Sequence, residues 1–157
     1  MKDLDWSNLG FGYRRTDYNV RCYYRDGKWG EIEVCSSEYV NLHMAATCLH
    51  YGQEAFEGLK AFRCPDGKVR VFRMDENAAR LQSTCRGIMM PEVSTELFEE
   101  MVAKVVRLNQ EYIPTYESGA SLYIRPLLIG TSAQVGVHPA TEYVFIIFVT
   151  PVGPYFK

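Results

Sequence analysis

The chain has 157 residues and a formal net charge of −2 at pH 7, and 47% of its residues are hydrophobic and 23% charged. This composition is typical of one globular domain. Lys and Arg form no cluster, which argues against nucleic acid as a partner because such binding needs a basic face. The sequence contains no apolar run long enough to span a bilayer and no apolar secretory segment, so we expect a cytoplasmic protein without a membrane partner.

Cysteine and histidine usage predicts neither disulfides nor a metal site. The five cysteines are widely spaced and include no Cys-x-x-Cys pair. We therefore expect reduced thiols, as in a reducing compartment. A metal ion needs several thiolates or imidazoles at short spacing, and His43, Cys48 and His50 do not follow such a pattern.

The first predicted element is a β-hairpin. Val20 to Arg25 has the composition of a strand, and Asp26-Gly27 supplies the two residues with positive φ that a type I′ turn requires. The return strand is expected from about Trp29 to Cys35. Ser36 to Ala46 follows as a loop, because its residues show no regular period.

A second hairpin and a helix are expected next. Leu59 to Arg63 and Val69 to Phe72 form the two strands, with a Pro-Asp-Gly turn between them. Asp75 is a candidate N-cap for a helix from Glu76 to about Arg86. Gly87 is the expected end of this helix, since glycine is favoured just beyond a helix C-terminus.

The clearest helical pattern lies in the second half of the chain. A helix is predicted from Glu96 to about Glu111, with Ser94 or Thr95 as its N-cap and Pro114 closing it. Its apolar residues follow the i, i+3, i+4 rule and therefore form one stripe on the helix. The residues of this stripe are Phe98, Met101, Val102, Val105 and Val106.

The last two predicted strands decide the fold class. Leu122 to Ile129 and Tyr143 to Val149 are nearly continuous apolar runs, so both should be central strands covered on both faces. The order of strand pair, strand pair, two helices and strand pair indicates an α+β fold, a mostly antiparallel sheet with helices packed on one side. Residues 1–150 would form this domain. Residues 151–157 hold two prolines and a glycine, the composition of a linker between domains.

Three side chains are the main candidates for a binding site. Arg80, early in its predicted helix, could clamp a phosphate with two parallel hydrogen bonds, or it could be an ordinary solvated arginine. Tyr123 and Arg125 are two residues apart in a strand, so they share a face. They could receive a small carboxylate, or they could be a core tyrosine and one half of an internal Arg–Glu bridge.

Aromatic residues beside glycines mark a further segment of interest. Tyr51 and Phe56 lie next to Gly52 and Gly58. Glycine in such a setting indicates a place where the backbone approaches another group closely. The segment leads directly into the strand predicted to begin at Leu59.

Other possible kinds of site find less support. Glu54 and Glu57 show no sign of the opposed environments that a catalytic carboxylate pair needs, so structural roles are favoured. Phe11, Phe56 and Tyr155 are of a type found more often in a core than in a pocket wall. The sequence contains no Gly-x-Gly-x-x-Gly and no phosphate-loop lysine, and its three histidines have no partner for general-base catalysis.

Five segments together resemble the N-terminal domain of the branched-chain-amino-acid aminotransferases, which are fold-type-IV pyridoxal-phosphate enzymes. The matching segments are Leu49 to Phe62, Asn77 to Leu81, Gly119 to Pro126, Gly136-Val137 and Pro151 to Gly153. They are spread over most of the chain. Their combination is highly specific, although any one of them alone would be weak.

The resemblance implies a role for each main candidate. Arg80 would hold the phosphate of pyridoxal 5'-phosphate, and Tyr123 would lie by the α-carboxylate of the substrate. Arg125 would bind the side-chain carboxylate of glutamate. Tyr51 would assist it from the other subunit of a homodimer.

The resemblance also implies how the pocket discriminates between substrates. The walls for a branched aliphatic side chain would be Phe11, Phe56 and Tyr155. Val135 and Val137 would reach the neighbouring subunit's site on their loop. One pocket would then serve two substrates, with apolar walls for leucine, isoleucine or valine and a polar rim for glutamate.

A catalytic residue of this family is missing from the sequence. The lysine that carries the cofactor lies in the C-terminal domain of these enzymes, and no lysine here falls in a matching segment. We therefore expect that lysine beyond Lys157, in a large domain absent from this chain, and no transaminase activity from the 157 residues alone. The full-length enzyme would transfer the amino group between leucine, isoleucine or valine and 2-oxoglutarate by a ping-pong route.

Two alternatives stay open. Another fold-type-IV enzyme, a D-amino-acid aminotransferase or an aminodeoxychorismate lyase, would share the cofactor but not the substrates. A stand-alone module that binds a small carboxylate without catalysis would have a closed surface. A domain separated from its large partner domain would instead expose an apolar face.

Overall fold

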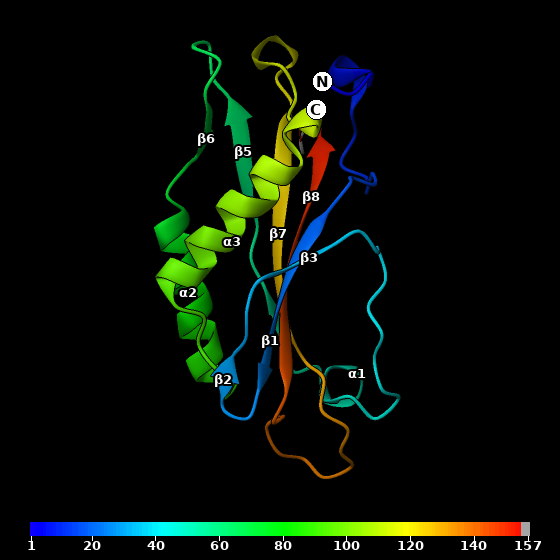
Figure 1. Cartoon of the computed structure of the whole chain (residues 1–157), viewed down its shortest axis with the longest axis vertical. Coiled ribbons are helices and arrows are strands. Elements are labelled where there is room, and N and C mark those ends of the chain that lie inside the picture. Colours follow the sequence, from blue (N-terminus) through cyan, green and yellow to red (C-terminus); the bar gives the residue numbers. More distant parts are fainter. Residues whose placement is uncertain (155–157) are drawn as a thin grey trace.

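The described residues of the chain fold into an eight-stranded sheet with two long helices on one face, as shown in Figure 1. The structure is a computed structural model, and it describes residues 1–154. Within these residues every strand pairing is antiparallel, and the main strand order is β2-β1-β8-β7-β5-β6. β3 pairs with β1, and β4 pairs with β7. The predicted α+β class, with helices on one side of an antiparallel sheet, is confirmed.

The strands are β1 (Asn19–Arg25), β2 (Lys28–Trp29), β3 (Glu33–Cys35), β4 (Glu54–Phe56), β5 (Leu59–Arg63), β6 (Val69–Val71), β7 (Ser121–Gly130) and β8 (Tyr143–Val152). The α-helices are α1 (Thr47–Tyr51), α2 (Met74–Gly87) and α3 (Thr95–Leu108). Short 3-10 helices occur at Trp6–Asn8, Gln110–Tyr112 and Tyr116–Ser118.

The first hairpin has the predicted turn. Asp26 and Gly27 have φ angles of 52° and 77°, the positive values that a type I′ turn requires. The return strand is broken into β2 and β3, and both pieces pair with β1. Residues 30–32 between them are in no strand, although the Gly30 N–H still donates to the carbonyl of Tyr23 (2.8 Å). The single return strand predicted from Trp29 to Cys35 is therefore corrected to two short ones.

The second hairpin, formed by β5 and β6, is confirmed, but the predicted N-cap of the following helix was wrong. α2 begins at Met74, and Arg73 occupies the N-cap position in a left-handed conformation (φ 48°) without a capping hydrogen bond. Asp75 lies inside the first turn. There its negative charge favours the positive end of the helix dipole.

α3 is stabilised by the predicted cap and the predicted apolar stripe. The Ser94 hydroxyl accepts a hydrogen bond from the Leu97 N–H (3.1 Å), and the five stripe residues are buried. The helix ends at Leu108, three residues before the predicted end. Asn109 follows it, and its side chain accepts from the N–H groups of Asp17 and Tyr18. A long-range contact therefore ends the helix earlier than the local pattern indicates.

Replacing Ser94 with alanine should lower the free energy of unfolding by about 1 kcal/mol, because the Leu97 N–H at the start of α3 loses its acceptor. Chemical denaturation measures the change. Ser94→Asp is the matched control, since aspartate is as favourable an N-cap as serine and keeps a side-chain acceptor for the Leu97 N–H. Equal losses in the two variants would contradict the capping role.

The main core lies between the helices and one face of the sheet. α2 contributes Leu81 and Cys85, and the α3 stripe packs against residues of β8 such as Phe145. A second, smaller cluster of Ile129, Val144 and Ile146 lies on the opposite face. β7 and β8 are central, as predicted, but the face away from the helices is covered only in part.

Two short elements were not predicted. α1 is five residues long and is terminated by Gly52 in a left-handed conformation (φ 62°). β4 has three residues and pairs with the C-terminal half of β7.

All five cysteines are free. Within residues 1–154, no helix combines the length and the apolar character needed to cross a membrane.

Candidate functional site

Alternation along β7 places Tyr123 and Arg125 on the face of the sheet away from α2 and α3. Leu122 and Ile124 are fully buried in the main core, whereas Tyr123 and Arg125 are partly exposed. Successive side chains of a strand point to opposite faces. The prediction that Tyr123 and Arg125 share a face is therefore confirmed.

Arg125 is held by aromatic groups. Its Nη2 and Nε donate to the Tyr123 hydroxyl at 2.9 and 3.3 Å, and its guanidinium lies over the Phe56 ring, 4.4 Å from the centroid. Within residues 1–154, no carboxylate lies within 4.0 Å of Arg125. The internal Arg–Glu bridge is thus not found, and the positive charge is available to an anionic ligand.

Two aromatic residues predicted for the pocket wall lie beside this pair. Phe11 meets Tyr123 edge to face, with ring centroids 5.2 Å apart. Phe11 is 39% exposed and Phe56 62% exposed, so the alternative that these two belong to the core is wrong. Tyr155 lies outside the described residues.

A break in the sheet positions the next part of the site. β4 and β5 both pair with β7, and the gap between them lies opposite Pro126. The Pro126 carbonyl accepts from the Glu57 N–H (3.0 Å), but proline has no N–H to return. The ladder is interrupted here, and Glu57 and Gly58 form a corner between the two strands.

The position of Gly58 at this corner explains why the sequence has a glycine near aromatic residues here. A Cβ at this position would lie 2.5 Å from the Tyr123 hydroxyl oxygen. Only glycine allows this close approach of backbone and phenol. Gly52 has a different reason, the left-handed conformation that terminates α1.

Arg80 forms an ion pair at the same corner. Its Nε and Nη2 donate to the two carboxylate oxygens of Glu57 at 2.8 and 2.6 Å. The hydrogen bonds to Glu57, and then its negative charge, raise the pKa of the Arg80 guanidinium. Asn77, one turn earlier on α2, donates to the same carboxylate (3.1 Å). Arg80 is therefore not an unpaired solvated arginine, although its side chain is 68% exposed.

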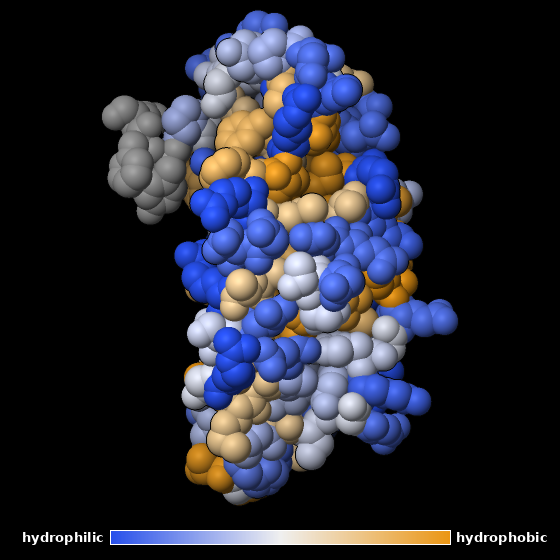
Figure 2. Space-filling model, turned by 90° about the vertical axis from the view of Figure 1, so that its left-hand side faces the viewer, coloured by the Kyte–Doolittle hydropathy of each residue, from blue (hydrophilic) through white to orange (hydrophobic). Residues whose placement is uncertain are grey.

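The helix and the strand face meet in one shallow pocket of about 380 Å³, whose lining includes Gly58, Asn77 and Tyr123. Exposed Phe62 and Phe72 also line it. The side of the molecule that carries α2 and β6 shows hydrophobic residues gathered in its upper half, framed by hydrophilic ones (Figure 2). Neither Arg80 nor Arg125 lines this pocket. They adjoin it through their partners, because Arg80 is bonded to Glu57 and Arg125 to Tyr123, which lies against Gly58.

Tyr51, Val135 and Val137 form a separate group. The Tyr51 hydroxyl donates to the Val135 carbonyl, and both valines are more than 80% exposed. They lie at α1 and the loop after β7, at the opposite end of the sheet from the chain termini (Figure 1). Another pocket contains Tyr51 and Val137 but shares no lining residue with the Tyr123 pocket.

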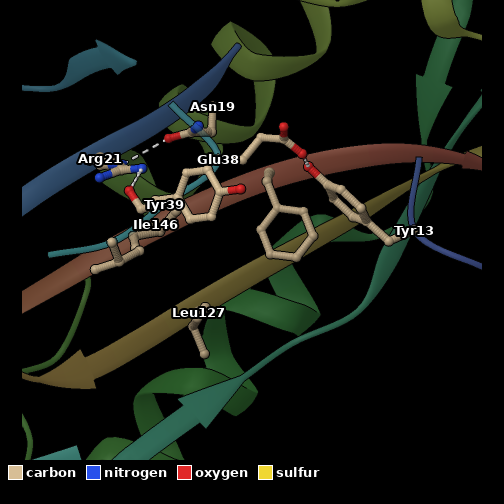
Figure 3. Close-up of a pocket in the computed structure, with 9 residues that line it drawn as sticks. Tyr13, Asn19, Arg21, Glu38, Tyr39, Leu127 and Ile146 are labelled. Carbon is tan, nitrogen blue, oxygen red and sulfur yellow. Dashed lines mark hydrogen bonds between the residues drawn. The ribbon is translucent and has the colours of Figure 1, made fainter. Parts of the chain in front are cut away.

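A cavity of about 280 Å³ that the sequence did not indicate lies on the same sheet face as Arg125 (Figure 3). Arg21, only 8% exposed, lines it and donates to the carbonyls of Ser37 and Tyr39 at 3.1 and 3.0 Å. Its Nε donates to Asn19 (2.9 Å). These contacts hold the loop after β3 against β1, so the buried guanidinium has a structural role.

Tyr13 at the rim of this cavity should titrate at about pH 12. Partial burial, followed by its hydrogen bond to Glu38 (2.8 Å) and the charge of that carboxylate, raises the pKa of Tyr13 from 10.0 to about 12. The folded state then holds the proton more tightly. The resulting stabilisation is fully present below pH 10 and is lost as the pH rises from 10 to 12.

Tyrosinate absorbance measures this titration, as the difference between the parent chain and Tyr13→Phe. Because Tyr13 is 59% exposed, solvent screens the interaction and its effect on stability is small. The titration is therefore the better measure. If the Tyr13→Phe substitution removes a titration near pH 10 and not one near pH 12, the prediction is wrong.

The antiparallel sheet with helices on one face matches the fold of the small domain of the fold-type-IV aminotransferases. Within this class, the chain is homologous to the N-terminal part of the branched-chain-amino-acid aminotransferases. Over all 157 residues it is 49% identical to the branched-chain-amino-acid aminotransferase of Haemophilus influenzae, and it covers 46% of that protein. No family model matches the chain.

Solved structures agree with this relationship. The Escherichia coli branched-chain amino acid aminotransferase matches 91% of this chain with a TM-score of 0.68 and 28% identity, over 42% of its own length. The enzyme of the archaeon Thermoproteus uzoniensis, solved with norvaline, has the same fold, with a TM-score of 0.68 and 23% identity over 88% of this chain and 43% of its own. The chain thus spans less than half the length of the proteins it matches.

Proposed function

We propose that this chain contains the small domain of a pyridoxal-phosphate-dependent branched-chain aminotransferase. Pro151 and Val152, predicted for the linker, are the last residues of β8 and pair with β7, so the domain extends past residue 150 and the linker to a large domain would follow the strand. The full-length enzyme would transfer an amino group between leucine, isoleucine or valine and 2-oxoglutarate. The observation that carries this proposal is the hydrogen-bonded Tyr123–Arg125 pair between exposed aromatic rings, next to the corner that holds Arg80.

The geometry suits two kinds of substrate side chain. Phe11 and Phe56 supply apolar surface on either side of the Tyr123–Arg125 pair. A branched aliphatic side chain would bury this surface. The side-chain carboxylate of glutamate would instead accept hydrogen bonds from the remaining guanidinium N–H groups of Arg125. Such bonds between an arginine and a carboxylate are charge-assisted and therefore strong.

The donors present also fit the cofactor. Arg80 uses Nε and one N–H of Nη2 on Glu57 and so has further N–H groups for a phosphate. Pyridoxal 5'-phosphate would supply the electron sink for the reaction. This chain would anchor the phosphate through Arg80 and orient the substrate carboxylate through Tyr123.

We also propose a homodimer for the full-length enzyme. Tyr51, Val135 and Val137 lie together but apart from the Tyr123 pocket. Their exposure is what residues serving a neighbouring subunit's site would need. A cytoplasmic location stays a prediction.

The test uses the full-length protein that contains this sequence. Turnover of L-leucine with 2-oxoglutarate is expected, whereas the 157-residue chain should be inactive. Preference for D-alanine or for aminodeoxychorismate would assign another fold-type-IV activity instead. Binding of small carboxylates without any turnover would indicate a non-catalytic module, and catalysis by the isolated chain would contradict the division of the site between two domains.

A further inference from the structure

The ion pair at the β4–β5 corner is unequal in its surroundings. The Glu57 side chain is 3% exposed, whereas that of Arg80 is 68% exposed. A buried carboxylate needs strong partners to offset its lost hydration. Glu57 is therefore the fixed member of the pair, and Arg80 is the member that reaches outward.

Contacts other than Arg80 fix the position of Glu57. Its N–H donates to the Pro126 carbonyl (3.0 Å), and the Asn77 side chain donates to its carboxylate (3.1 Å). Asn77 belongs to α2 and Pro126 to β7. The backbone of Glu57 is thus tied to β7, and its carboxylate to α2, before Arg80 is considered.

The two bonds from Arg80 leave a defined part of its guanidinium uncommitted. Nε and one N–H of Nη2 point to Glu57, so the plane of the guanidinium is fixed by two parallel bonds. The two N–H groups of Nη1 and the second N–H of Nη2 form the outer end of the fork. Without Glu57, a long and exposed side chain would sample many orientations.

We propose that Glu57 is a positioning residue that orients the outer N–H groups of Arg80 toward the cofactor phosphate. This inference rests on the proposed function. The negative charge of Glu57 also repels a phosphate, but Arg80 lies between the two anions and the exposed end of the pair is screened by solvent. Orientation is therefore the larger effect, and loss of Glu57 weakens phosphate binding.

The experiment titrates the full-length apoenzyme with pyridoxal 5'-phosphate and, separately, with pyridoxal, which lacks the phosphate. Glu57→Gln keeps the shape of the side chain but removes its charge and one of its two acceptors. Its Kd for pyridoxal 5'-phosphate should rise about tenfold, the low end of what loss of a supporting partner costs a metal ligand. Its Kd for pyridoxal should stay unchanged.

Three controls separate positioning from general damage. Glu54→Gln, at an exposed glutamate on β4, should bind both compounds like the parent enzyme. In an Arg80→Gln background, Glu57→Gln should cause no further loss, because the guanidinium it orients is gone. Asn77→Ala, which loosens Glu57 without removing it, should weaken pyridoxal 5'-phosphate binding in the same direction by about threefold, below the tenfold loss of a supporting partner, and it serves if Glu57→Gln does not fold.

Unchanged or tighter binding of pyridoxal 5'-phosphate to Glu57→Gln would overturn the proposal, as would an equal loss for pyridoxal. A further loss in the Arg80→Gln background would also overturn it, because Glu57 would then act independently of Arg80. If Arg80→Gln alone binds pyridoxal 5'-phosphate normally, the phosphate anchor of the proposed function fails, and the inference fails with it.

Discussion

Replacing Phe98 with alanine is expected to lower the free energy of unfolding by about 3–5 kcal/mol, the usual cost of removing a buried aromatic ring. Phe98 is fully buried on α3 and stacks on Phe145 of β8, with ring centroids 6.1 Å apart and an interplanar angle of 29°. It joins the helix to a central strand. The cavity left behind would be bordered on one side by a sheet that cannot collapse into it.

Chemical denaturation of the parent chain and the variant measures this loss. Phe72→Ala is the matched control, because it deletes the same atoms from a residue that is 77% exposed. That control should change stability by less than about 1 kcal/mol, as surface substitutions usually do. A similar loss in both variants would show that the α3 stripe does not dominate the core.

Features set by neighbours along the chain were predicted well. The turn at Asp26-Gly27 requires only two adjacent residues that tolerate positive φ, and both have it. The α3 stripe repeats every three or four residues, so its burial follows from the helix period alone. Tyr123 and Arg125 share a face because a strand alternates, wherever its partners lie.

Features set by distant contacts were predicted poorly. β4 exists because it pairs with β7, more than 70 positions later, and three residues carry too weak a pattern to predict a strand. α3 ends early because Asn109 bonds to a segment near the N-terminus. The ion pair of Glu57 and Arg80 joins residues that are 23 positions apart in the sequence. Such pairings depend on the folded arrangement of the sheet.

The site divides in the same way. The sequence offered Arg80 as a possible phosphate ligand, but only the family resemblance favoured that role over an ordinary solvated arginine, because a single arginine on a helix has many uses. It favoured a structural role for Glu57 and did not identify its partner. The cavity beside Arg21 and Tyr13 went unnoticed, since its lining comes from distant segments of the chain.

Replacing Gly58 with alanine in the full-length enzyme is expected to lower kcat/KM by about 10- to 100-fold, because a displacement of about 1 Å in a substrate-positioning group can cost 100-fold in rate. The new Cβ would lie 2.5 Å from the Tyr123 hydroxyl oxygen and 3.2 Å from the ring carbon that bears it. The phenol must therefore move, and it is the acceptor of both Arg125 bonds.

The expected loss is specific to this corner. Gly30→Ala is the matched control, because a Cβ there would meet only the Tyr23 carbonyl oxygen, at an ordinary contact distance of 3.4 Å, and the residue lies between β2 and β3, away from Tyr123. It should leave kcat/KM unchanged. Gly58→Ala should keep its affinity for pyridoxal 5'-phosphate, since Arg80 and Glu57 are not displaced, while the KM for both leucine and glutamate rises. If Gly58→Ala loses affinity for the cofactor while KM is unchanged, the substitution acts on Arg80 and not on Tyr123. If the kinetics are normal, the Tyr123 ring does not position the substrate.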